Sequence, residues 1–95
     1  MIMAKIRCEK VSDGLRSSEA IASFVDLHGR THFIRVERDF LEKQHDGSNF
    51  LPVGIVHVDT KNKAVLIELP HEAETGANRL WISKQQVEGL EEAFA

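Results

Sequence analysis

The strongest constraint in this 95-residue sequence is one stretch in which two apolar runs flank a short polar tract. It covers residues 50–70 and reads FLPVGIVHVDTKNKAVLIELP. The apolar runs are rich in β-branched residues, which favour strands, whereas Asp59 and Asn62 in the tract favour turns. The stretch therefore predicts a β-hairpin. We expect a three-residue loop over residues 60–62, with Asp59 opposite Lys63.

This loop decides which side chains share a face, because successive residues of a strand point to opposite sides of a sheet. One predicted face is apolar and suits a core: Val53, Ile55, Val65, Ile67 and Leu69. The other face is apolar as well: Val56, Val58, Ala64 and Leu66. A small domain covers one such face easily. The second face predicts a cover made by a helix, a loop or another subunit.

Shorter elements are predicted on the N-terminal side of this hairpin. Residues 4–10 alternate between apolar and polar side chains, which indicates a half-buried strand with Cys8 on its inner side. Residues 39–42 have the Asp-x-x-Glu spacing of a capped helical turn. The polar run 43–49 predicts a loop.

A second hairpin is predicted over residues 19–38, with Gly29 and Arg30 at the centre of a two-residue turn. The resulting register pairs Leu27 with His32 and Val25 with Ile34. It places one set of side chains toward a core: Ile21, Ser23, Val25, Leu27, His32, Ile34 and Val36. On the other face it brings Phe24 and Phe33 together diagonally.

The C-terminal part predicts a strand and then a helix. Residues 71–78 form a turn-rich loop, and residues 80–82 are a short strand. Ser83 and Gln86 have the spacing of a capping box, which marks the start of a helix. Apolar residues then follow at helical spacing: Val87, Leu90 and Phe94.

These elements predict a mainly β fold in one domain over residues 1–95. We expect a small antiparallel, partly open barrel of about five to six strands with a short C-terminal helix. Residues 53–69 contain a Gly-Ile-Val start, an acidic turn and a Val-Leu-Ile strand. In this pattern they resemble the strand pair of PRC-barrel and other SH3-like domains. The resemblance covers about a fifth of the chain and implies an architecture without functional residues.

Composition narrows the class of protein. Hydrophobic residues make up 42% and charged residues 28%, as in folded proteins, and the net charge is −3. The single cysteine cannot form an internal disulfide, and the start of the chain lacks a signal-peptide pattern. We therefore expect a cytoplasmic protein. No apolar run approaches the roughly 20 residues that span a bilayer, so we expect no membrane association.

The chemistry-bearing residues do not form an enzyme motif. The five histidines suggest a metal or small-molecule site that would use His57 and Asp59, with His71 as a further candidate ligand. Their spacing matches no zinc motif, so we interpret the histidines as structural and expect no metal and no cofactor. Cys8 reads as a small buried hydrophobe. Without a nucleophile motif, a phosphate loop or paired carboxylates, we expect no enzymatic activity.

Binding to another protein, most simply a second copy in a homodimer, is the leading hypothesis. Trp81 and Arg79 are of the types that dominate binding hot spots, although packing as core under the terminal helix is the commoner role for such a tryptophan. The candidate partner-binding residues are Trp81, Arg79, Val56, Val58 and Leu66. Metal or small-molecule binding is the second hypothesis. Weak single-stranded nucleic-acid binding by Phe24, Phe33 and Arg35 is the third, because the overall charge is acidic.

Overall fold

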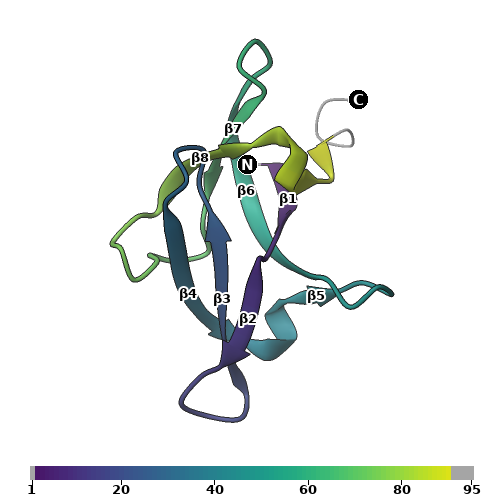
Figure 1. Cartoon of the computed structure of the whole chain (residues 1–95), viewed down its shortest axis with the longest axis vertical. Coiled ribbons are helices and arrows are strands. Elements are labelled where there is room, and N and C mark those ends of the chain that lie inside the picture. The colour runs from purple at the N-terminus through teal and green to yellow at the C-terminus, as the bar shows by residue number, and fades with distance from the viewer. Residues whose placement is uncertain (1, 91–95) are drawn as a thin grey trace.

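The computed structural model describes residues 2–90, and the fold is mainly β, as predicted (Figure 1). The strands are β1 (Ile2–Arg7), β2 (Lys10–Asp13), β3 (Glu19–Val25), β4 (Thr31–Glu37), β5 (Glu42–Lys43), β6 (Asn49–Asp59), β7 (Ala64–Glu68), β8 (Arg79–Ser83) and β9 (Val87–Glu88). Two single-turn 3-10 helices are η1 (Arg38–Phe40) and η2 (Lys84–Gln86). The helical turn expected near residues 39–42 is therefore present, slightly earlier in the chain.

The strands form two antiparallel sheets. The larger sheet has the order β8-β7-β6-β1-β9, with β5 beside one end of β6, and the smaller sheet has the order β2-β3-β4. Figure 1 shows that β1 continues into β2, so one stretch of chain passes from the larger sheet to the smaller one. The change of sheet occurs between two residues: the Cys8 N–H donates to Asn49 in β6, and the Glu9 N–H donates to Ser23 in β3. The sheets are not closed into a barrel.

One hydrophobic core lies between the two sheets. The largest fully buried apolar side chains come from both of them: Ile6, Phe24, Ile34, Leu51, Val53, Val65, Ile67 and Ile82. The predicted inner side of the first strand is confirmed, because Ile6 and Cys8 are buried. The predicted core face of the central hairpin is confirmed too, since Val53, Ile55, Val65, Ile67 and Leu69 are all buried.

The loop of the central hairpin is one residue longer than predicted. Asp59 pairs with Ala64, so the loop comprises four residues and Lys63, rather than Asn62, has a positive φ of 53°. A β-bulge at Val56 then restores the predicted pairs Ile55–Ile67 and Gly54–Glu68. Between the loop and the bulge, strand β6 is shifted by one residue. A shift of one residue moves side chains to the opposite face, so Val58 points toward the core rather than away from it.

The register predicted for the first hairpin is wrong by three residues. Val25 pairs with Thr31 and Phe24 with His32, which leaves a five-residue connection in place of the expected two-residue turn. Asp26 explains the difference, because its carboxylate accepts hydrogen bonds from the N–H groups of His28 and Arg30 and holds a wider loop. The inner face of β4 was predicted correctly, whereas β3 turns Ala20, Ala22 and Phe24 inward.

The helix predicted to begin after Ser83 is not formed over residues 83–89. Ser83 and Gln86 do form a capping box, but it caps only the single turn of η2. Val87 and Glu88 then pair with β1 as strand β9, and Gly89 follows with a φ of 90°, which a right-handed helix cannot contain. The end of the predicted stripe, Phe94, lies outside the described residues.

Strands β2 and β5 were not predicted either. Strand β2 begins at the end of the strand predicted over residues 4–10, and β5 lies where the predicted helical turn meets the polar loop. Both are paired with longer strands, β2 with β3 and β5 with β6. Among residues 2–90 we find no helix that combines the length and apolar character needed to cross a membrane.

Candidate functional site

The solvent side of the larger sheet carries a row of three side chains on neighbouring strands. His57 in β6 pairs with Leu66 in β7, and Leu66 pairs with Trp81 in β8. Paired residues share a face, so all three side chains lie on the side of the sheet away from the core. The His57 and Trp81 rings meet edge to face, with 6.1 Å between centroids, and flank Leu66. We call this side of the sheet the outer face.

The next row of the outer face adds an exposed methionine and an ion pair. Met3 lies opposite Gly54, and Gly54 lies opposite Glu68, which pairs in turn with Arg79. Met3 is 61% exposed, although its side chain is large and apolar. The Arg79 Nε donates to Glu68 Oε1 at 2.9 Å. The outer face thus combines half-exposed apolar side chains with charges that neutralise one another.

Four of the five candidate partner-binding residues remain near this face. Trp81 and Leu66 are half-buried and lie in the same row, Arg79 is in the adjacent row, and Val56 is half-buried at the bulge. Val58 is separated from them, because the bulge turns it toward the core. There it lines a groove of about 1500 Å³ together with Leu27, Val87 and Leu90.

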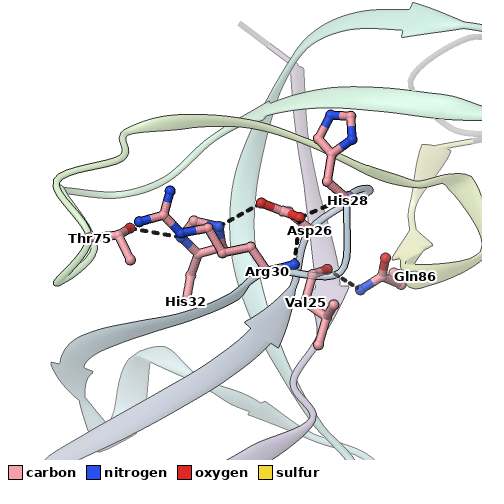
Figure 2. A network of polar contacts seen from close by, with 7 residues as sticks. All are labelled: Val25, Asp26, His28, Arg30, His32, Thr75 and Gln86. Carbon is pink, nitrogen blue, oxygen red and sulfur yellow. Dashed lines mark hydrogen bonds and ion pairs between the residues drawn. The ribbon is translucent and has the colours of Figure 1, made fainter.

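A buried histidine joins the first hairpin to the loop 70–78 (Figure 2). His32 is 1% exposed, and its Nε2 lies 2.8 Å from Asp26 Oδ2. Its Nδ1 lies 2.8 Å from the Thr75 hydroxyl oxygen. Both ring nitrogens are hydrogen-bonded when Nε2 donates to the Asp26 carboxylate and Nδ1 accepts from the Thr75 hydroxyl. Phe24 stacks against the same imidazole, with 5.6 Å between ring centroids.

The Asp26 carboxylate is the centre of these contacts. Its Oδ1 accepts the N–H groups of His28 and Arg30, each at 2.9 Å, while Oδ2 contacts His32. Burial raises the pKa of Asp26, but the hydrogen bonds from His32, Arg30 and His28 together outweigh it. The pKa of Asp26 is therefore lowered from its ordinary value of 3.8.

A hydroxyl, an imidazole and a carboxylate in line are also the parts of a nucleophile relay. Such a relay needs a place for the substrate next to the hydroxyl. Thr75 does not line either of two grooves that lie in the described part of the chain. The contacts of the Asp26–His32–Thr75 network connect the first hairpin loop to the loop 70–78.

The position of the first hairpin loop matters for the outer face. The Leu27 N–H donates to the Trp81 carbonyl at 2.8 Å, and the Gln86 side chain donates to the Val25 carbonyl at 3.0 Å. Figure 2 shows Gln86 reaching Val25 at the base of the loop that Asp26 organises. The network therefore fixes the loop against β8, the strand that carries Trp81.

The residues of the metal hypothesis do not converge. His57 lies on the outer face, Asp59 binds Asn62 within the turn, and His71 Nε2 contacts the Arg35 carbonyl at 2.6 Å. Within residues 2–90 no group of three or more His, Cys, Asp or Glu side chains is placed to hold a metal ion. Cys8 is buried, and burial raises the pKa of its thiol to about 11, so it is a poor nucleophile.

The residues of the nucleic-acid hypothesis are also divided. Phe24 is fully buried in the core, whereas Phe33 is 43% exposed on the solvent side of the smaller sheet. Arg35 follows on the same side of β4, two residues further along. One aromatic side chain therefore remains exposed where two were expected.

Sequence spacing could not reveal the His32 network, because His32 and Thr75 are 43 residues apart. The signal that was present is the Asp-x-x-Gly spacing of Asp26 and Gly29, which is typical of a turn closed by a left-handed glycine.

Comparison with known proteins found no matching family model, no matching curated protein and no matching solved structure.

Proposed function

We propose that this protein is a non-catalytic protein-interaction module that self-associates through the outer face of its larger sheet. The observation that carries the proposal is the row formed by His57, Leu66 and Trp81. A half-exposed tryptophan and leucine, with exposed Met3 in the next row, give the aromatic and aliphatic anchors that dominate binding energy at interfaces.

A second copy of the chain is the partner that suits this face best. Glu68 and Arg79 are the acidic and basic residues of the two rows described above, and their charges balance one another across a distance of 2.9 Å. A partner of strong net charge, such as a nucleic acid, would gain nothing from such a surface. Two-fold self-association requires a patch that is complementary to a second copy of itself. An apolar centre beside a balanced ion pair meets this requirement.

The proposal includes the finer architecture and location expected from the sequence. We propose that the two sheets form a partly open barrel of the SH3-like kind. The direct passage of the chain from β1 in one sheet to β2 in the other supports this view. A cytoplasmic location is part of the same proposal and is supported by the lone, buried cysteine.

Sedimentation velocity over a wide range of protein concentration tests self-association directly. We expect a monomer–dimer equilibrium in the native chain. Leu66→Lys should weaken it at least about tenfold, because a charge would be desolvated at the centre of the interface. Met3→Lys should act in the same direction without touching the core, since Met3 is 61% exposed.

The matched control is Phe33→Lys. Phe33 is also a large exposed hydrophobic residue, but it lies on the smaller sheet, so the dimer should persist. A native chain that stays monomeric at every concentration would contradict the proposal. Equal loss of the dimer in the Met3 and Phe33 variants would place the interface elsewhere.

A further inference from the structure

Strand β8 is the end strand of the larger sheet, with β7 on one side of it. The backbone N–H and C=O groups along the outer edge of an end strand can pair with a strand of another molecule. The sequence of β8 reads RLWIS, with three apolar residues in succession and one charged residue. An apolar edge with so little charge requires protection if the chain is not to pair through it.

Three residues of β8 direct their backbone groups toward this outer edge. Directly after the strand, the Lys84 N–H donates to the Lys63 carbonyl on the β7 side. Successive residues of an antiparallel strand bond alternately to its two sides. Arg79, Trp81 and Ser83 therefore direct their N–H and C=O groups away from β7.

The first hairpin is connected to this edge at two points. The Leu27 N–H donates to the Trp81 carbonyl at 2.8 Å. The Gln86 side chain makes the second connection, since its Oε1 accepts from the Ser83 N–H at 3.1 Å and its Nε2 donates to the Val25 carbonyl at 3.0 Å. Both connections use backbone groups that β8 directs away from β7.

Asp26 lies between the two residues of the first hairpin that make these connections, Val25 and Leu27. Its carboxylate accepts the N–H groups of His28 and Arg30 and so holds the loop in one shape (Figure 2). The network around Asp26 therefore sets the position from which the Leu27 N–H reaches β8.

We propose that the first hairpin loop guards this edge and prevents β8 from pairing with the β8 strand of a second copy. An identical strand suits the edge, because in antiparallel pairing centred on Trp81 each Arg79 lies opposite a Ser83 and like charges do not meet. Leu80 of one copy then lies opposite Ile82 of the other. The inference is independent of the proposed function, which concerns the outer face of the larger sheet and not its edge.

Sedimentation velocity of the full chain tests the guard in a Leu66→Lys background, which keeps the outer face out of the measurement. Gln86→Ala frees the Ser83 N–H and detaches the base of the loop at Val25. Gln86 is half-buried in a single 3-10 turn, so this change leaves the core in place. We expect the Leu66→Lys chain to sediment as a monomer, and the double variant to shift toward dimers as its concentration rises.

A proline at position 83 shows whether this association uses the β8 edge. Ser83 has a φ of −70°, close to the roughly −65° of proline, and its N–H is not part of the ladder with β7. Ser83→Pro should abolish the association that Gln86→Ala causes, because it removes a donor from the edge. The control is Ile34→Val, which removes a buried methyl group from the smaller sheet, leaves the guard intact and should stay monomeric in the same background.

Three outcomes would overturn the guard. A Gln86→Ala chain that stays monomeric would show that the edge needs no protection. Association that persists with Ser83→Pro would lie elsewhere, and equal association of the Ile34→Val chain would be an effect of lower stability. A Leu66→Lys chain that is already dimeric would contradict the proposed function instead, and the guard would then be judged by the association that Gln86→Ala adds.

Discussion

The loops of the two long hairpins, β3–β4 and β6–β7, are held in place in different ways. Each has an aspartate where the first strand ends, Asp26 after β3 and Asp59 in β6, and each aspartate accepts N–H groups of the following loop. Asp26 is also tied to the buried His32, whereas the bonds of Asp59 stay within its own turn. The first loop is therefore tied to a buried side chain. The second loop has side-chain bonds within its own turn and one backbone bond from a distant residue, in which the Lys84 N–H donates to the Lys63 carbonyl at 2.9 Å.

The hairpins also differ in the residue that takes the left-handed backbone conformation. The first uses Gly29, with a φ of 84°, and the second uses Lys63, with a φ of 53°. Glycine adopts this conformation without steric cost, whereas a residue with a Cβ does not. The first hairpin loop therefore adopts its left-handed position without steric strain, whereas the second loop carries a small steric cost at Lys63.

The largest expected effect comes from removing His32, the buried histidine of the first hairpin. His32→Ala should destabilise the protein by about 3 kcal/mol, because it leaves the Asp26 carboxylate without its buried partner and opens a cavity beside Phe24. Urea denaturation monitored by tryptophan fluorescence measures this loss. His45→Ala, in the exposed loop before β6, is the control and should change stability by less than about 0.5 kcal/mol. Similar losses in the two variants would mean that the network does not hold the hairpin.

A smaller effect follows from removing only the charge of Asp26. Because the pKa of Asp26 is lowered in the folded state, its carboxylate contributes stability above the unfolded pKa of about 4. This contribution is lost as the pH falls through the lower folded pKa. Asp26→Asn should therefore cost about 2 kcal/mol at pH 7 and much less near pH 3. Thermal unfolding at the two pH values measures the difference.

The corresponding change in the second hairpin is the control for this prediction. Asp59→Asn should shift the melting temperature by less than about 3 °C at pH 7, because Asp59 is bonded only to Asn62 of its own turn. A larger shift for Asp59 than for Asp26 would reverse the comparison between the hairpins.

The smallest expected effects are opposite in sign at the two left-handed positions. Gly29→Ala should destabilise the protein by about 1 kcal/mol through backbone strain alone, because a Cβ there would meet no other atom within 4 Å. Lys63→Gly should stabilise it by about 0.5 kcal/mol, since it removes that strain at an exposed position. Differential scanning calorimetry resolves both shifts. Stabilisation by Gly29→Ala would show that the loop is not held in the left-handed conformation.

The sequence predicted the fold class and most of the core because these depend on local patterns. The alternation of Val53, Ile55, Val65, Ile67 and Leu69 identified the inner face of the central hairpin, and all five are buried. The position of the bulge at Val56 was not predicted. A bulge has no sequence signature of its own, so the change in direction of Val58 could not be foreseen.

The candidate site was predicted in part. Trp81, Leu66 and Arg79 come together on the outer face because of the register between β7 and β8, which the sequence analysis did not give. His57 was interpreted as a structural residue or a metal ligand, and its contact with Trp81 across Leu66 depends on the shifted register. The partners of His32 could not be predicted, because a contact across 43 residues depends on the packing of the loop 70–78 against β4.

The direct passage of the chain from β1 into β2 has a consequence for how the protein unfolds. Neighbouring amides, those of Cys8 and Glu9, are hydrogen-bonded to different sheets. The two sheets also share one core, to which both contribute apolar side chains. Because loss of either sheet would expose this common core, we expect the two sheets to unfold together in one cooperative transition.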